Sequence, residues 1–192
     1  MPFTIYESPF GPLTLVGDGS GLRHLYFPRR APRLDEEDHE PHALRATSER
    51  ALRLAPGHAL GAATEQLEEY FCGARTAFDL PLALDGTPFQ RAVWRALREI
   101  PYGSTTTYGA LAHGLAPHWG GDTPNPRAVG AAVGATPIPI IIPCHRVIGA
   151  DGSLTGYGGG LHRKQALLDF EAAGGQRSGF GAAGRQRQLT LL

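Results

Sequence analysis

The stretch IPIIIPCHRVIG, residues 138–149, places one of only two cysteines directly before a histidine and an arginine, behind isoleucines interrupted by prolines. Such β-branched residues are typical of a buried strand, but Pro139 and Pro143 each remove a backbone donor from any sheet. We therefore expect an edge strand or an extended segment outside a sheet. A segment stiffened in this way holds Cys144 in one fixed place.

Cys144 and its neighbour His145 suggest nucleophilic chemistry. A thiol with an ordinary pKa of ~8.5 is mostly protonated at neutral pH, so a base must take its proton. Neighbouring side chains on a strand point to opposite faces, and the two residues can therefore cooperate only if the chain turns at residues 143–145. A carboxylate would then orient the imidazole, and Glu171 is the best-placed acidic residue because it lies on the inward side of a predicted helix. Most Cys-His pairs are structural, so this pair alone does not establish a function.

A content of 42% hydrophobic and 19% charged residues in a chain of 192 is typical of a soluble globular protein with one large or two small domains. The sequence has no apolar run of about 20 residues and no secretory signal, so we expect a cytoplasmic protein that does not bind membranes. Two cysteines, Cys72 and Cys144, are too few for a disulfide framework, and no C-x-x-C pair begins a zinc site. We therefore expect free thiols, no metal ion and no cofactor.

The N-terminal half begins with three short β-type runs, FTIY, PLTLV and LRHLYF, which Gly- and Pro-containing turns separate. They predict a small meander of strands over residues 1–27. Residues 28–48 are polar and contain prolines, which indicates an exposed connection. A helix is predicted from about Ala62 to Gly73, and Cys72 at its end is interpreted as a core residue. The run FDLPLALDG then predicts a strand and linker that end near residue 86.

The second half begins with a capping box, in which Thr87 and Gln90 flank Pro88 and predict a helix start. Two shorter helices follow, over YGALAHGL and from Asn125-Pro126 onward. Together they are compatible with a helix-turn-helix, although this pattern alone is weak evidence. The Asp151-Gly152 pair predicts a hairpin, which would be a wing, and HRKQALLDFEAAG predicts a final helix.

Charge is unevenly distributed along the chain although the formal net charge is zero. Residues 1–86 contain 8 Lys and Arg against 13 Asp and Glu, whereas residues 87–170 contain 7 against 4. Residues 87–170 are therefore the part of the chain better suited to bind a polyanion, although an excess of three positive charges is also common by chance.

The motif PCHR, followed by VIGADGSLTGYGGG and preceded by FQRAVWRALREIPYG and RAVGAA, resembles the O6-alkylguanine-DNA alkyltransferase family over about residues 87–171. The resemblance implies an α+β fold with a ribonuclease-H-like N-terminal domain (1–86) and a winged helix-turn-helix domain (87–173), followed by a flexible tail (174–192). It also implies that the protein removes alkyl groups from guanine O6, and less efficiently from thymine O4, by a single transfer to its own cysteine.

The resemblance also assigns roles to single residues. Cys144 matches the alkyl acceptor, His145 its base acting through water, and Glu171 the carboxylate that orients the histidine. Tyr108 matches the tyrosine that contacts guanine N3, and Arg127 the arginine that fills the stack when the nucleotide rotates out. The remaining matches are a pocket wall (Tyr157), two carbonyls for the guanine amino group (Val147 and Cys144), an amide donor to O6 (Gly158) and a lysine near the pocket whose role we leave open (Lys164).

Two further features follow from this resemblance. Thr136 stands where the family usually has an asparagine that braces the turn before the cysteine, and threonine offers fewer hydrogen bonds. The helix RAVGAAVGA, which contains Ala128 and Gly130, has no side chain larger than valine apart from Arg127, which suits close packing on another helix equally well as a ligand-facing role. With the resemblance, its small surface is expected to press into a DNA minor groove about 6 Å wide. The expected partner is thus double-stranded DNA containing alkylated guanine, bound by a monomer.

Two other functions use the same residues. A cysteine hydrolase also needs Cys, His and a carboxylate, but it forms a thioester that water cleaves, whereas a thioether has no such exit. A damage sensor would bind alkylated guanine without repair, and such relatives lack the acceptor cysteine that this chain retains as Cys144.

Overall fold

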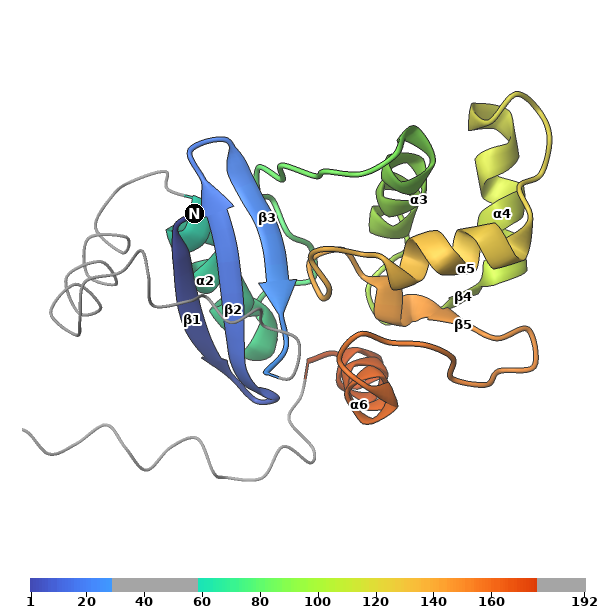
Figure 1. The fold of residues 1–192 in the computed structure, drawn as a ribbon. Helices are drawn as coiled ribbons and strands as arrows, with labels where there is room; N and C mark the ends of the chain where they lie inside the picture. The colour runs from blue at the N-terminus through green and yellow to red at the C-terminus, as the bar shows by residue number, and fades with distance from the viewer. Residues whose placement is uncertain (29–58, 176–192) are drawn as a thin grey trace, which may run out of the picture.

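The computed structural model describes residues 1–28 and 59–175, and Figure 1 shows helix α2 behind the strands β1 to β3, with the remaining helices to the right, beyond the β3 edge of this sheet. The α+β class expected from the sequence is confirmed. The predicted connection over residues 28–48 and the predicted tail after residue 174 fall almost wholly outside the described residues. Within the described part of the chain, no helix is long and apolar enough to cross a membrane.

The predicted strand meander is confirmed as an antiparallel sheet of β1 (Phe3–Ser8), β2 (Gly11–Asp18) and β3 (Gly21–Tyr26), in that order. Leu15 on the central strand pairs with Leu25 and is fully buried. Helix α2 (Ala59–Phe71) packs against all three strands and begins three residues earlier than expected. It buries Leu60, Ala63, Leu67, Tyr70 and Phe71.

The prediction that Cys72 fills the core is wrong, because its side chain is exposed. Helix α2 ends at Phe71, and Gly73 turns the chain with φ of 81°, a conformation that suits glycine. Cys72 therefore lies just beyond the last helical residue on the outer side, where its sulfur contacts the Glu69 carbonyl oxygen at 3.2 Å.

The second half is built from α3 (Pro88–Arg98), α4 (Tyr108–Leu115), the 3₁₀ turn η2 (Ala116–His118), α5 (Pro126–Gly134) and α6 (Leu161–Ala172). The predicted capping box is confirmed, since Thr87 and Gln90 form it reciprocally at the start of α3. Thr107 caps α4, and α5 begins as predicted after Asn125, which caps it. Helices α3, α4 and α5 pack against one another in pairs. The buried Trp94 on α3 donates its ring N–H to the Ala132 carbonyl of α5 at 2.9 Å.

The predicted hairpin wing is only partly present. The turn forms, with the Gly149 amide donating to the Ser153 carbonyl at 2.8 Å, but residues 150–160 contain no strand. Instead β5 (Val147–Ile148) pairs in parallel with β4 (Thr106–Thr107). The ammonium of Lys164 binds the carbonyls of Val147 (2.6 Å) and Thr155 (2.8 Å), so a side chain holds these two arms together where a strand ladder was expected.

The isoleucine run is a compact turn, which corrects the expectation of an edge or extended segment. The Ile142 amide donates to the Ile138 carbonyl at 2.9 Å, and Ile140 has a left-handed φ of 76°. A β-branched residue in this region is strained by about 1–3 kcal/mol. Burial of the isoleucines offsets this strain, since each of the four is at most 4% exposed.

The two halves of the chain are joined by backbone and side-chain contacts. The Leu25 amide on β3 donates to the Pro137 carbonyl at 3.0 Å. Phe27 packs edge-to-face on Tyr157 at 5.7 Å. The N-terminal sheet therefore lies directly against the segment that leads to Cys144.

We expect Thr87→Ala to lower the free energy of unfolding by about 1 kcal/mol, because it removes the side-chain oxygen that accepts from Gln90 N. Thermal melting should show a decrease of about 2–4 °C for a chain of this size. Thr87→Ser keeps the hydroxyl and is the matched control. Equal losses for serine and alanine would show that the cap does not stabilise α3.

Candidate active site

Cys144, His145 and Arg146 form a 3₁₀ turn, η3 (Cys144–Arg146), and all three side chains are buried. This is the turn that the Cys-His pair requires, because in a turn the side chains of Cys144 and His145 are no longer forced to opposite faces of a strand. Helix α6 lies beside it and supplies two more buried charged residues, Lys164 and Glu171. The turn and the helix together concentrate a nucleophile, a potential base and three charges in the interior.

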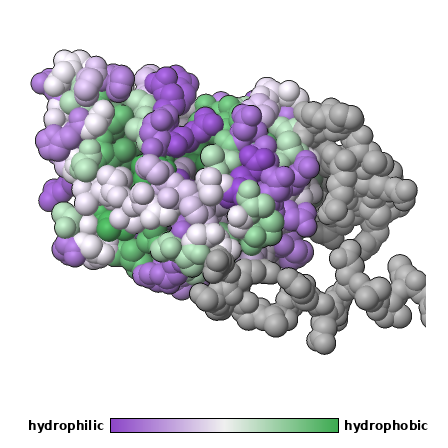
Figure 2. Space-filling model, turned by 180° about the vertical axis from the view of Figure 1, so that it is seen from behind, coloured by the Kyte–Doolittle hydropathy of each residue, from purple (hydrophilic) through white to green (hydrophobic). Residues whose placement is uncertain are grey.

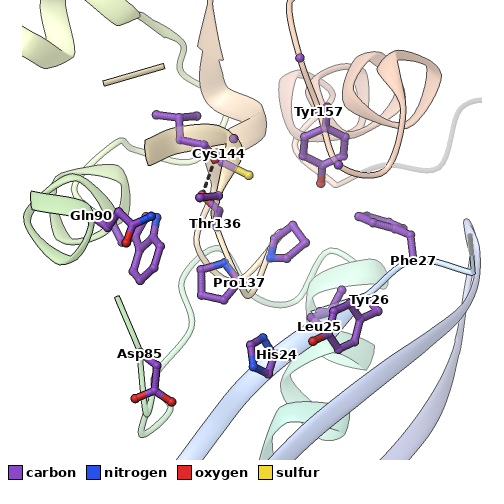
Figure 3. Close-up of a pocket in the computed structure, with 17 residues that line it drawn as sticks. His24, Leu25, Tyr26, Phe27, Asp85, Gln90, Thr136, Pro137, Cys144 and Tyr157 are labelled. Carbon is purple, nitrogen blue, oxygen red and sulfur yellow. Dashed lines mark hydrogen bonds between the residues drawn. The ribbon is translucent and has the colours of Figure 1, made fainter. Parts of the chain in front are cut away.

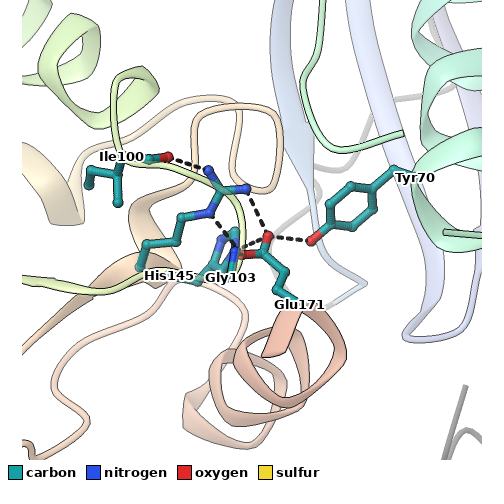
Figure 4. Close-up of polar contacts among 6 residues, drawn as sticks. Tyr70, Ile100, Gly103, His145 and Glu171 are labelled. Carbon is teal, nitrogen blue, oxygen red and sulfur yellow. Dashed lines mark hydrogen bonds and ion pairs between the residues drawn. The ribbon is translucent and has the colours of Figure 1, made fainter. Parts of the chain in front are cut away.

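The Glu171 carboxylate is the centre of a hydrogen-bond network (Figure 4). The His145 ring nitrogen Nε2 lies 2.9 Å from Oε1, so the expected His-Glu contact forms. Arg146 donates to both carboxylate oxygens, from Nε and Nη2, each at 2.9 Å, and its Nη1 donates to the Ile100 carbonyl at 2.6 Å. The Gly103 amide donates to Oε2 at 3.1 Å.

A fifth donor to Glu171 comes from the other half of the chain. The hydroxyl of Tyr70, on α2, donates to Oε1 at 2.7 Å. Neither Tyr70 nor Arg146 was assigned a polar role from the sequence. Arg146 could have been noticed, since it follows the Cys-His pair directly, but the sequence places Tyr70 with Leu67 and Phe71 on the apolar stripe of the helix predicted to end at Gly73, which suggests only a packing role.

The network determines the charge states of its members. Burial alone would raise the pKa of Glu171, but hydrogen bonds from His145 and Arg146 outweigh it and lower the pKa to about 2. Burial lowers the pKa of His145 more strongly than Glu171 raises it. The resting site therefore contains an ionised carboxylate and a neutral imidazole.

The neutral imidazole of His145 has one free nitrogen. When Nε2 carries the proton and donates to Glu171, Nδ1 carries a lone pair, and this buried atom has no hydrogen-bond partner among the described residues. A neutral imidazole with an unused acceptor and a carboxylate behind it is the arrangement of a general base.

Cys144 is 6% exposed, and burial raises the pKa of its thiol to about 11, an effect that the side-chain hydrogen bond with Thr136 and, more weakly, the positive charge of Lys164 oppose. The resting group is thus a thiol, which needs a base before it can act as a nucleophile. Lys164 is itself fully buried and fixed by the Val147 and Thr155 carbonyls, so its charge has a defined position.

Cys144 lines a pocket of about 340 Å³ between the two halves of the chain (Figure 3). Tyr157 forms one wall, and its buried hydroxyl has no partner in the described structure. Thr136 and Gly158 also line the pocket, as does the end of β3 over residues 24–27. The contribution of β3 was not expected from the sequence, because nothing local ties residues 24–27 to the cysteine.

The other candidate residues lie on the face formed by α4 and α5. Tyr108 is half-buried at the start of α4, where its hydroxyl accepts from the Thr155 hydroxyl at 3.2 Å. Arg127 and Ala128 are exposed in the first turn of α5. Gly130 faces Tyr108, since a Cβ there would lie 3.7 Å from the tyrosine ring. The structure therefore separates the candidates into a pocket group and a surface group.

The described residues hold no group of three or more His, Cys, Asp or Glu side chains arranged to hold a metal ion.

On the face seen in Figure 2, hydrophobic residues occur in small clusters between hydrophilic ones rather than as one broad apolar surface.

Two family models match the chain in succession. Residues 1–84 match the model described as "6-O-methylguanine DNA methyltransferase, ribonuclease-like domain", and residues 88–173 match the corresponding DNA binding domain. The chain is 48% identical over 165 residues to a methylated-DNA–protein-cysteine methyltransferase of Mycobacterium tuberculosis, covering 86% of this chain and 88% of that protein. It is 43% identical over 173 residues to one of Methanosarcina acetivorans, covering 90% and 99%.

Solved structures give the same result. A crystal structure of Mycobacterium tuberculosis OGT in complex with DNA is similar with a TM-score of 0.70 and 45% sequence identity, over 90% of this chain and 93% of that one. The M. tuberculosis O6-methylguanine methyltransferase, also solved as a crystal structure, is similar with a TM-score of 0.66 and 45% identity, over 89% and 92%.

We expect N-ethylmaleimide to modify Cys72 at least about tenfold faster than Cys144 in the folded protein at neutral pH, because Cys72 is exposed whereas Cys144 is buried with a raised pKa. Peptide mapping over time measures both rates. In Cys72→Ser only the slow reaction should remain, and unfolding in denaturant should abolish the difference. Modification of Cys144 as fast as Cys72 would contradict the burial described here.

Proposed function

Because this chain belongs to the methylated-DNA–protein-cysteine methyltransferase family, we propose that Cys144 is the residue that accepts the alkyl group. The protein is an O6-methylguanine DNA methyltransferase, which repairs alkylated DNA by transfer to a protein cysteine, and it binds DNA. Its N-terminal part is ribonuclease-like and its C-terminal part is a DNA-binding domain. The proposed limits of these domains are residues 1–86 and 87–173.

One observation carries the assignment of Cys144. Of the two thiols, only Cys144 lines a pocket and adjoins a buried His-Glu pair, whereas Cys72 is exposed at the end of α2. A thiolate in a largely buried pocket is a strong nucleophile, and His145 has the free acceptor nitrogen needed to generate it. The proposed base is thus His145, acting through a water molecule, with Glu171 orienting the ring.

The proposed reaction is a single displacement at the alkyl carbon. The thiol proton of Cys144 passes through the water molecule to Nδ1 of His145, and the sulfur forms a bond to the carbon as the bond from carbon to O6 breaks. The electron pair of that bond stays on the guanine, which takes up one proton and becomes an unmodified base. The fixed charge of Lys164 favours the thiolate during this step.

Access to the sulfur requires the damaged nucleotide to leave the duplex, because O6 of a stacked base cannot reach a buried thiol. The proposed surface for the duplex is the α4 and α5 face, where the small, exposed Ala128 lets the backbone of α5 approach a minor groove and Gly130 leaves room for the Tyr108 ring. Arg127 lies at the exposed start of α5, a position that suits insertion into the stack. Tyr108 lies at the start of α4, with its ring next to Gly130 of α5.

The pocket offers groups suited to an extruded guanine. Tyr157 presents an aromatic wall, and the Gly158 amide is the proposed donor to O6. The proposed acceptor for the amino group is the carbonyl of Val147, a fully buried residue on β5 directly after η3. The Val147 carbonyl already accepts from Lys164, but an sp² oxygen has a second lone pair. Thr136 donates to the Val133 carbonyl at 2.7 Å, which supports a bracing role at the end of α5 (Figure 3).

These proposals extend to partners and location. The proposed ligand is double-stranded DNA with an alkylated guanine, bound by a monomer in the minor groove without sequence preference, since damage arises in any context. The substrate, being DNA, supports a cytoplasmic location. Activity on thymine O4 is proposed as a weaker reaction of the same site.

We expect product to reach a plateau at one equivalent when the protein is mixed with excess oligonucleotide containing O6-methylguanine. A thioether is not hydrolysed, and no second thiol adjoins Cys144 within the described residues, so each molecule reacts once. Mass spectrometry should place one methyl group on Cys144. Cys144→Ser should give no transfer, and Cys72→Ser should behave as the wild type. Product well beyond one equivalent, or methyl on Cys72, would refute the assignment.

We expect Arg127→Ala to slow repair of duplex DNA by about tenfold or more while changing repair of single-stranded DNA little. The inserted side chain offsets an unstacking cost of a few kcal/mol that only a duplex imposes. Single-turnover rates on both substrates measure the effect, and Arg98→Ala, an exposed arginine on α3, is the matched control. Equal losses on both substrates would show that Arg127 is only a phosphate contact.

A further inference from the structure

Tyr70 connects the N-terminal half of the chain to the acid–base residues. It is fully buried on α2, and its hydroxyl donates to Oε1 of Glu171 at 2.7 Å. The same oxygen lies 2.9 Å from Nε2 of His145 and accepts from Nη2 of Arg146. Oε1 is therefore shared by three donors, and one of them comes from a different domain (Figure 4).

The Tyr70 hydroxyl can act only as a donor in this position. Burial and the adjacent Glu171 charge hold the pKa of Tyr70 well above its usual value of 10.0, so the phenol keeps its proton. Its ring is fixed by edge-to-face or tilted contacts with Phe71, Phe78 and Phe170 at 5.1 to 5.5 Å. A core tyrosine needs only some acceptor for its hydroxyl, but this one uses the oxygen that also binds the proposed base.

We propose that Tyr70 is a positioning residue for alkyl transfer: its hydroxyl fixes the Glu171 carboxylate and limits the negative charge that Oε1 presents to His145. The inference rests on the proposed role of His145 as the base. It assigns to the ribonuclease-like domain a direct part in the chemistry of the other domain.

The direction of the effect follows from the shared oxygen. Removing one donor leaves more negative charge on Oε1 facing Nε2, which favours the imidazolium and raises the pKa of His145. The neutral base is then lost at a higher pH, so the acidic limb of the pH–rate profile moves upward. The variant leaves the other charged or titratable groups around His145 and Glu171 in place. These groups are Arg146 of η3, Tyr102 of the segment after α3, Lys164 of α6, Cys144 beside the histidine, and Tyr157, whose ring lies 6.4 Å from the imidazole.

The test compares Tyr70→Phe with Tyr102→Phe in the full chain. Tyr102 packs against Tyr70 at 6.0 Å and lies under Arg146, but its hydroxyl makes no hydrogen bond to Glu171, so it is a matched control. Single-turnover methyl transfer is measured against pH, and the His145 ring is titrated by nitrogen NMR in the unreacted protein. For Tyr70→Phe we expect both the acidic limb and the His145 titration to move upward by about 0.5 to 1 pH unit. Tyr102→Phe should leave both unchanged.

A second variant keeps the test decisive if phenylalanine disturbs the fold. A ring-fluorinated tyrosine at position 70 keeps the packing but is a stronger donor, so it should move the His145 titration downward. Unchanged titrations in both Tyr70 variants, or equal shifts in Tyr70→Phe and Tyr102→Phe, would overturn the inference. Failure of the wild-type protein to transfer methyl groups would instead refute the proposed function. The NMR titration would still show whether the Tyr70 hydroxyl affects the pKa of His145.

Discussion

The buried Glu171 carboxylate is the constraint on which the rest of the site depends. An ionised carboxylate without partners in a protein interior costs several kcal/mol, so the fold must supply donors to it. Here the donors come from α2, from the segment after α3 and from η3, three parts of the chain that are far apart in sequence. The charge therefore forces these segments together around the end of α6. The same carboxylate that orders them also holds His145 in the tautomer that leaves Nδ1 free.

Local sequence signals predicted most elements and several of their ends. Thr87 with Gln90, and Asn125 with Pro126, predicted the starts of α3 and α5 because a cap needs only neighbours a few residues away. The inward orientation of Glu171 followed from helical periodicity in the same way. The family resemblance then linked Cys144, His145 and Glu171, and the structure brings the last two into contact.

Features set by distant contacts could not be predicted from the sequence. Ile140 adopts a left-handed conformation because burial of its neighbours outweighs local strain, and no sequence rule anticipates this for isoleucine. Residues 150–160 lack strands because the Lys164 ammonium, rather than a ladder, binds the backbone of both arms. Cys72 was expected in the core, but a shift of one residue beyond the last helical turn exposes it.

The contacts of β3 with the cysteine segment restrict how the two domains can change over evolutionary time. The Leu25 amide is bound to the Pro137 carbonyl, and Phe27 packs against both Tyr157 and Gly159, where a Cβ would lie 2.7 Å from its ring. A ribonuclease-like domain taken from another protein would leave the Pro137 carbonyl unpaired and Tyr157 unsupported unless it supplied the same two contacts. The domains are thus fitted to each other at this boundary, and a change at Phe27 or Gly159 requires a matching change in the residue it packs against.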